Sequence, residues 1–165
     1  EKELEKMLTI DCTSLTLQQM WLLIAVLVSG DKPVEFLKAW KLPSKTIKYL
    51  LSGLTWMKKR RETPWTQWDV YDAGLSVAVD VEKVHSVLYQ DEDMTEQIQT
   101  LYENLPIKHR KELSVNGHDL CMWFQKKPGP WLRACLEEIE KAVLDQKTIN
   151  EKEKIKEWLK RCNRL

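Results

Sequence analysis

The stretch SKTIKYLLSGLTWMKKRR, residues 44–61, decides the fold class of this chain. Its apolar residues recur at intervals of three and four, which places them along one side of an α-helix. Ser44 is a residue type favoured at helix N-caps, and the four cations that close the stretch suit a helix C-terminus. We therefore predict a helix over 44–61 whose apolar stripe is Ile47, Leu50, Leu51, Leu54 and Met57.

The residues before this stretch predict two further helices. Leu15–Ser29 is rich in apolar residues, as in a buried helix, and Gly30 follows where a left-handed cap is needed. Pro33 suits the first position of a shorter helix that reaches Trp40. The most apolar run, Met20–Val28, is much shorter than the roughly 20 residues that cross a bilayer, so no membrane span is predicted.

Three more helices are predicted between residues 63 and 105. Thr63-Pro64 is a start signal for the first helix, and Gly74 ends it. The acidic loop Asp91–Asp93 precedes the last helix, which Pro106 breaks. No segment of useful length alternates with period two, so the whole chain is predicted to be all-α. The three helices are Trp65–Ala73, Leu75–Tyr89 and Met94–Leu105.

The remaining residues predict a smaller helical group. Asn116-Gly117 is typical of a turn that contains a left-handed residue, and Lys126–Pro130 is typical of a tight basic loop. Asn150 and Glu153 have the spacing of a helix capping box. The predicted helices are His118–Gln125, Trp131–Val143 and a final helix with the stripe Ile155, Trp158, Leu159 and Cys162.

Charge is distributed unevenly along the chain. The net charge is only +1, but residues 1–105 hold 12 Lys and Arg against 16 Asp and Glu, which gives −4. Residues 106–165 hold 14 against 9, which gives +5. Such asymmetry favours a basic end that meets an anionic partner, and a solvated helix face is the alternative. We place a boundary here, between a helical body, 1–105, and a smaller basic tail, 106–165.

The termini and the cysteines indicate the compartment. Residues 1–6 are charged and have the pattern of neither a signal peptide nor a transit peptide. The four cysteines show no CxxC spacing, so a disulfide framework or a zinc site is not expected. Unpaired thiols are typical of the reducing cytosol, and we expect a cytoplasmic protein.

Two motifs could carry chemistry, and the sequence favours a structural role for both. Asp91-Glu92-Asp93 has the D-x-D spacing of two-metal nucleotidyl transfer, but that chemistry needs a rigid strand and a nearby glycine-rich loop. His118-Asp119 is like the pair of metal phosphohydrolases, which need several further His and Asp ligands. Asp119 is better placed to accept hydrogen bonds at a helix start. We therefore predict no catalytic residue and no metal ligand in this chain.

Basic clusters are the candidates for binding. Lys126–Pro130 precedes a predicted helix, and a glycine turn with cations at a helix N-terminus is suited to phosphate, although it could simply turn the chain. Lys108, His109, Arg110 and Lys111 form a second cluster. The last helix carries Lys154, Lys156, Lys160 and Arg161, of which Lys156 and Lys160 share a face by spacing.

The tail motifs also resemble a known family. In the bacterial CCA-adding enzymes, within the tRNA nucleotidyltransferase and poly(A) polymerase family, a Leu-Pro-Ile segment leads to Asn-Gly-x-Asp-Leu, a Lys-Pro-Gly-Pro turn and an Asn-started final helix. Here Leu105–Ile107, Asn116–Leu120, Lys127–Leu132 and Asn150–Leu159 match in that order. Residues 1–105 resemble the neck-to-body region more loosely. Family members often have glycine where this chain has Gln125.

The resemblance implies an enzyme that adds C, C and A to the tRNA 3′ end with Mg²⁺, CTP and ATP. Its catalytic head would precede residue 1, so this chain would be a C-terminal part, inactive alone, that holds the acceptor stem and T-arm. The residues expected to contact RNA are Lys108, His109, Arg110, Lys111, Asn116, Gly117, Lys126, Lys127, Gly129, Lys156 and Lys160.

The alternative is a module for protein interaction or dimerisation. The chain has eight tryptophans, five of them in the body, and large aromatic side chains often anchor contacts between helices. In that case the body would bind another helix or a second copy of the chain, without RNA.

Overall fold

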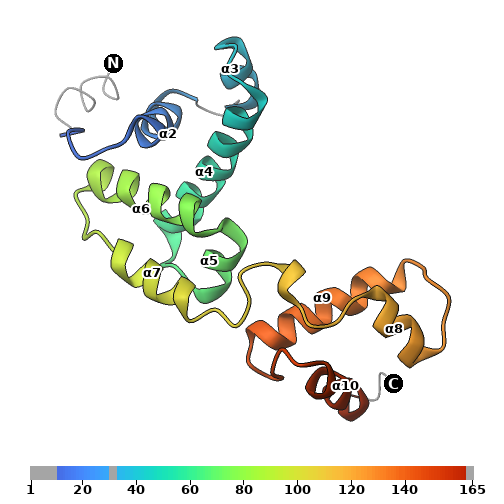
Figure 1. Ribbon diagram of the computed structural model, residues 1–165. Helices are drawn as coiled ribbons and strands as arrows, with labels where there is room; N and C mark the ends of the chain where they lie inside the picture. The colour runs from blue at the N-terminus through green and yellow to red at the C-terminus, as the bar shows by residue number, and fades with distance from the viewer. Residues whose placement is uncertain (1–10, 30–32, 163–165) are drawn as a thin grey trace. The chain divides into compact units, whose positions relative to one another are not determined.

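The structure is a computed structural model that describes residues 11–29 and 33–162, and these residues are helical without any strand (Figure 1). The all-α prediction is therefore confirmed. The chain divides into two compact units, Glu1–Glu103 and Asn104–Leu165. Within the described residues, no helix is both long and apolar enough to traverse a bilayer. The predicted cap at Gly30 and the charged segment 1–6 lie outside the described residues.

Unit 1 is arranged around the helix α6. This helix contacts α2, α4, α5 and α7, and α2 also packs on α4. In Figure 1, α6 lies between α2 on one side and α7 on the other. The helices of the unit are α2 (Leu17–Val28), α3 (Pro33–Ala39), α4 (Ser44–Glu62), α5 (Gln67–Ala73), α6 (Leu75–Tyr89) and α7 (Thr95–Glu103).

The core of unit 1 contains the apolar stripe predicted on α4. Leu50 and Met57 are buried, and the other three stripe residues are partly buried against the same cluster. Gly53 lets α4 approach α2 closely, because a Cβ atom there would lie 2.6 Å from Leu22 Cδ1. Gly74 ends α5 as predicted, and its φ of +76° favours glycine. The pattern of residues 44–61 thus predicted both the helix and its buried side.

Two carboxylates of α6 connect it to its neighbours. Glu82 is fully buried, and it accepts hydrogen bonds from Arg60 Nε (2.7 Å), Trp65 Nε1 (2.8 Å) and the Met94 backbone N–H (3.2 Å). Asp80 accepts from the Gln19 side chain (2.7 Å) and the Tyr49 hydroxyl (2.7 Å). The helices α2 and α4, and the segments that precede α5 and α7, are therefore fixed to one helix.

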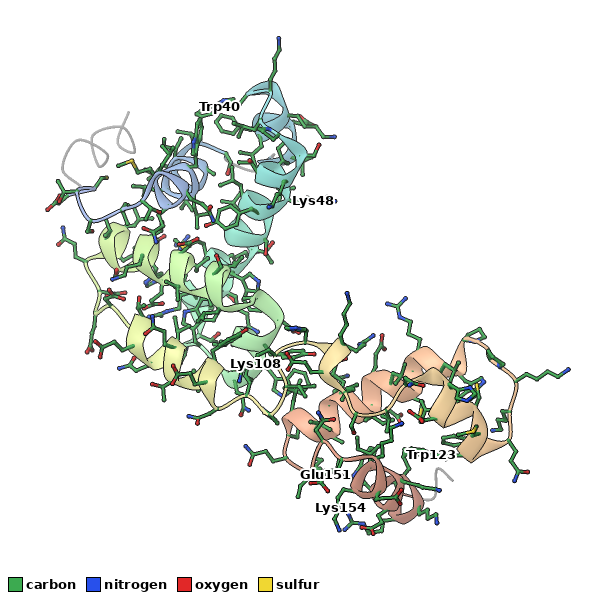
Figure 2. The ribbon with its side chains drawn as sticks, viewed as in Figure 1. Trp40, Lys48, Lys108, Trp123, Glu151 and Lys154 are labelled. Atoms are coloured by element: carbon green, nitrogen blue, oxygen red, sulfur yellow. The ribbon has the colours of Figure 1, made fainter. Side chains whose placement is uncertain are left out.

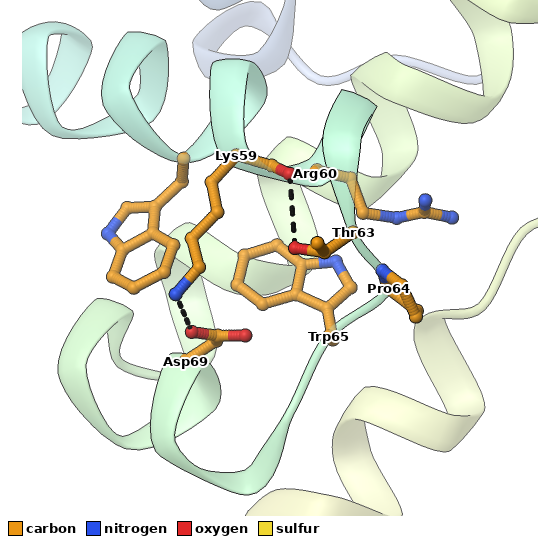
Figure 3. A pocket seen from close by; sticks show the side chains of 7 residues that line it. Lys59, Arg60, Thr63, Pro64, Trp65 and Asp69 are labelled. Atoms are coloured by element: carbon orange, nitrogen blue, oxygen red, sulfur yellow. Dashed lines mark hydrogen bonds and ion pairs between the residues drawn. The ribbon is translucent and has the colours of Figure 1, made fainter.

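The junction of α4 and α5 is closed by an aromatic stack and an ion pair. The rings of Trp56 and Trp65 stack with centroids 5.6 Å apart. Figure 3 shows Lys59 reaching Asp69 of α5, and the Thr63 hydroxyl donates to the Lys59 carbonyl (3.4 Å). Lys59 is thus a structural cation.

Unit 2 has three α-helices and one 3₁₀ helix among its described residues. The 3₁₀ helix η1 (Arg110–Glu112) precedes α8 (Gly117–Phe124), α9 (Trp131–Leu144) and α10 (Lys152–Arg161). In the stripe predicted for the last helix, Ile155 and Leu159 are buried and Trp158 is partly buried, which confirms this part of the prediction. Cys162 was predicted in the same stripe but is exposed, because it lies just after the last residue of α10. The largest fully buried side chains of the unit are Ile107, Leu120, Ile139, Ile155 and Leu159.

Two helix-start signals predicted in unit 1 are wrong, although α4 begins at Ser44 as predicted. Pro43 occupies the N-cap position of α4 in place of Ser44, because its extended backbone, with ψ at 142°, lies just outside the helix. At α5 the cap is Thr66 rather than the Thr63-Pro64 pair. The Thr66 hydroxyl accepts from the Asp69 N–H (3.2 Å) while Asp69 accepts from the Thr66 N–H (3.0 Å). This capping box satisfies two backbone donors at once.

Two predictions for unit 2 are also wrong. Asn116 is not in a left-handed turn with Gly117 but is the N-cap of α8, where its side chain accepts from the His118 N–H (2.8 Å). Asn150 does not cap α10, whose N-cap is Glu151. The Asn150 side chain instead accepts from the Ser114 N–H and donates to the Glu112 carbonyl, both at 2.8 Å. A contact across 36 residues therefore outcompetes the local cap.

The buried Glu82 gives a prediction about stability. Replacing Glu82 by Ala leaves Arg60, Trp65 Nε1 and the Met94 N–H without their acceptor, and we expect the free energy of unfolding to fall by about 3 kcal/mol. Urea denaturation followed by circular dichroism measures this change. The exposed Glu92→Ala variant is the control, expected within about 0.5 kcal/mol of the parent chain. Equal effects of the two variants would contradict the structural role of Glu82.

Candidate nucleic-acid interface

Three of the four residues in the basic cluster 108–111 are engaged within unit 2. Arg110 donates from Nε to Glu140 Oε2 (2.8 Å), and Glu140 is buried on α9. The Lys108 ammonium donates to the Leu105 carbonyl (3.0 Å), and His109 Nε2 lies 3.2 Å from a Glu112 carboxylate oxygen. The Arg110 contact holds η1 against α9, whereas the contacts of Lys108 and His109 are local.

Lys111 is the exception in this cluster. Its side chain is exposed and makes no ion pair or hydrogen bond with the residues that the structure describes. Its neighbours are engaged, so Lys111 is the member whose charge is most available to a ligand. The sequence could not distinguish Lys111 from Arg110, because Glu140, the partner of Arg110, lies 30 residues away along the chain.

The loop at 126–130 is shaped by its own aromatic residues. Gln125 ends α8 in the left-handed region, with φ at 52°. Trp131 Nε1 donates to the Lys127 carbonyl (3.0 Å) and its ring lies 5.3 Å from the Phe124 ring. A Cβ atom on Gly129 would lie 3.3 Å from Trp131 Cδ1, so this glycine provides room for the indole. The packing of Trp131 therefore explains the glycine at position 129.

The loop nevertheless presents charge and helix donors to solvent. Lys126 and Lys127 are exposed, and the Lys126 ammonium lies 5.8 Å from the centre of the Phe124 ring. Pro130 is the N-cap of α9 and supplies no side-chain acceptor to the first turn. The positive end of α9 therefore lies beside two exposed ammonium groups, an arrangement that attracts phosphate.

The cations of α10 face two different neighbours. The Lys156 ammonium lies 5.4 Å from the centre of the Trp123 ring of α8, and this lysine is half-buried. Lys160 instead lines a groove together with Lys154 and Arg161. Figure 2 labels Trp123 and Lys154 in this unit. The helical spacing that grouped Lys156 with Lys160 did not show that their surroundings differ.

His118-Asp119 belongs to the start of α8. Asp119 is buried, accepts from the Asn116 N–H (3.0 Å), and pairs with the Lys152 ammonium (2.9 Å). The hydrogen bond from Lys152, and next that from Asn116, hold the pKa of Asp119 below its usual range against the effect of burial. The interpretation of Asp119 as a helix-start acceptor is confirmed.

The acidic loop before α7 is bound by its own neighbours. Burial raises the pKa of Asp93, but its pair with Lys83 and its hydrogen bonds from Thr95, including one from the N–H (3.0 Å), together lower the pKa below its usual range. An Asp91 oxygen lies 3.7 Å from Nδ1 of the buried His85, and burial lowers the pKa of this histidine. No group of three His, Cys, Asp or Glu side chains within 11–29 and 33–162 is arranged to hold a metal ion.

Comparison with known proteins identifies the family. The model of the family described as tRNA nucleotidyltransferase domain 2 matches residues 13–159. The CCA-adding enzymes of Bacillus cereus (strain AH187) and Bacillus anthracis (strain CDC 684 / NRRL 3495) are 37% and 38% identical to this chain over 149 residues. Each alignment covers 89% of this chain but only 38% of the relative.

A solved structure shows the same fold. The crystal structure of the Bacillus stearothermophilus CCA-adding enzyme in complex with CTP matches with a TM-score of 0.81 and 33% sequence identity. The match covers 91% of this chain and 39% of that chain. The chain described here belongs to the tRNA nucleotidyltransferase domain 2 family, and the resemblance inferred from its tail motifs is confirmed. It spans about two fifths of the length of these relatives.

The left-handed Gln125 gives a prediction about the loop. A side chain in this region is strained, whereas glycine is not, so Gln125→Gly should raise the free energy of unfolding by about 1 kcal/mol. Ala134→Gly is the control. Ala134 is a solvent-exposed residue of α9, and glycine at a helical position should lower the free energy of unfolding by about 1 kcal/mol. Urea denaturation of both variants measures whether the free energy of unfolding rises or falls. A destabilised Gln125→Gly variant would show that the loop does not have this backbone.

Proposed function

We propose that this chain is the C-terminal, tRNA-binding part of an enzyme that adds nucleotides to the 3′ end of tRNA. The support is its family and its similarity to CCA-adding enzymes. Because the chain matches only 38% of those relatives, the proposal assigns nucleotide addition, with Mg²⁺, CTP and ATP, to other parts of such an enzyme. The chain alone is then expected to be inactive.

The observation that carries the binding role is the set of cations in unit 2 that the fold does not engage. Lys111, Lys126 and Lys127 are exposed, and two of them flank the uncapped start of α9. Double-stranded RNA presents phosphates and 2′-hydroxyls rather than accessible base edges. Ammonium groups and helix N–H groups match that chemistry, which agrees with a grip on the acceptor stem and T-arm.

The loop lysines allow a direct test of this proposal. The double variant Lys126→Ala and Lys127→Ala should weaken tRNA binding by about tenfold and reduce the slope of log K against log salt by about 2, because two phosphate contacts are lost. Fluorescence anisotropy with labelled tRNA at several salt concentrations measures both quantities.

The matched control keeps the charge. Lys126→Arg with Lys127→Arg should bind tRNA as the parent chain does, and circular dichroism should show that both variants are folded. If the alanine variant binds tRNA with an unchanged affinity and salt slope, the loop is not part of the interface.

A second candidate is a protein-interaction role for unit 1. Leu17, Val34 and Trp40 are exposed apolar residues at 72%, 43% and 41% of their full surface, and Trp40 packs on the Trp21 ring at 5.2 Å. Such residues favour contact with another helix or a second copy of the chain.

Sedimentation of the chain and of its Trp40→Ser variant tests this candidate. A dimer that the substitution dissociates, with tRNA affinity unaffected, would support it. A monomer at micromolar concentration would exclude a stable homodimer through this surface.

A further inference from the structure

We propose that a groove beside α10 binds the phosphate backbone of RNA, as a second contact separate from the loop at 126–130. This inference rests on the proposed tRNA-binding function and adds a surface to it. The α10 groove is formed by the turn between α9 and α10 and by one side of α10, and its volume is about 620 Å³. Its charged lining residues are Lys147, Lys154, Glu157, Lys160 and Arg161.

The charge of the α10 groove is strongly unbalanced. It is lined by four cations and one carboxylate. That carboxylate, Glu157, pairs with Lys154 at 3.4 Å, and Lys147 pairs with Asp145 at 2.8 Å. Lys160 and Arg161 are exposed and have no ion pair with any residue in the described part of the chain. A cleft lined by one sign of charge raises the local concentration of ions of the opposite sign.

The positions of these cations suit a chain of phosphates rather than a single ion. Lys154 and Arg161 are seven residues apart on α10, which corresponds to about 10.5 Å along the helix axis. Lys147 belongs to the preceding turn and lines the same groove from another element. Arg161 adds a planar guanidinium, which can donate two parallel hydrogen bonds to one phosphate.

The turn that carries Lys147 has a defined backbone. Gln146 is left-handed, with φ at 56°, and its N–H donates to the Val143 carbonyl (3.0 Å). The Lys147 N–H donates to the Ala142 carbonyl (2.8 Å), which completes a Schellman arrangement at the end of α9. Lys147 is therefore positioned by the helix end.

The α10 groove is distinct from the loop at 126–130 because α9 separates them. The loop precedes the first residue of α9, and the turn with Lys147 follows its last residue (Figure 1). A helix of 14 residues is about 21 Å long. The loop and the turn with Lys147 therefore lie at opposite ends of α9, about 20 Å apart along its axis.

An acidic peptide is the competing ligand for this groove, and the lining favours RNA. Peptide grooves take side chains into apolar pockets, whereas the exposed apolar residue here is a single one, Ile149, at 63% of its full surface. Four of the other lining residues are cations on long side chains, which can contact a regular row of phosphates.

The double variant Lys160→Gln and Arg161→Gln tests the proposal in the full chain. Both side chains are exposed, so the fold should persist by circular dichroism. We expect tRNA affinity to fall by about tenfold and the salt slope to decrease by about 2. The second variant is Lys147→Gln, which removes a cation from the side of the groove formed by the turn between α9 and α10. It should decrease the slope of log K against log salt by about 1.

The control changes net charge by the same amount elsewhere. Gln97 and Gln99 are exposed on α7 of unit 1, and their replacement by Glu also lowers the net charge by two. We expect less than a twofold change in tRNA affinity for this control. An equal loss in the control and in the groove variant would overturn the proposal, because the effect would then be general electrostatics.

The remaining outcomes separate this inference from the proposed function. If the parent chain does not bind tRNA, the proposed function fails and the groove proposal fails with it. If the parent binds and only the loop variant at 126 and 127 is weakened, the groove proposal alone is overturned. Binding of polyglutamate that is lost in the groove variant, with tRNA affinity unchanged, would assign the groove to an acidic protein partner instead.

Discussion

The buried carboxylate of Glu82 is the constraint on which unit 1 depends. A charge with no solvent exposure is tolerated only if it is paired and its lone pairs are satisfied, and Arg60, Trp65 and the Met94 N–H provide this. These donors come from α4, from the segment before α5 and from the segment before α7. One side chain of α6 thereby determines where three other segments lie, and an Arg60 that looks like a surface cation in the sequence becomes part of the core.

Pairing with a buried carboxylate also decides which cations of unit 2 are available to bind a ligand. Arg110 is held by the buried Glu140, and Lys152 is held by the buried Asp119. A cation engaged in this way would have to break a partly buried pair before it met a phosphate, and that costs more than losing contact with water. The proposed interface therefore consists of exposed cations that no buried carboxylate holds. These are Lys111, Lys126, Lys127, Lys147, Lys154, Lys160 and Arg161.

Local patterns predicted the helices, but contacts between distant residues decided the details. The stripe of residues 44–61 and the role of Asp119 at a helix start follow from spacing alone. Asn150 could not be assigned correctly, because its partners Glu112 and Ser114 lie more than 35 residues away. The left-handed residues Gln90, Gln125 and Gln146 were also missed, since glutamine carries no local signal for that backbone. The basic groove, formed by a turn and a helix, needed the folded structure for the same reason.

The arrangement of unit 2 is consistent with recognition by shape. The loop at 126–130 and the turn with Lys147 lie at opposite ends of α9, so the length of this helix sets the distance between the phosphates that these two segments can contact. Apart from Glu157, the exposed charged groups among the described residues of these surfaces are ammonium and guanidinium groups on long side chains, which contact phosphates whatever the base sequence. Under the proposed function, a fixed spacing with adaptable charges would accept any RNA helix of the correct geometry. Specificity for tRNA would then come from the distance between contacts rather than from the identity of the bases.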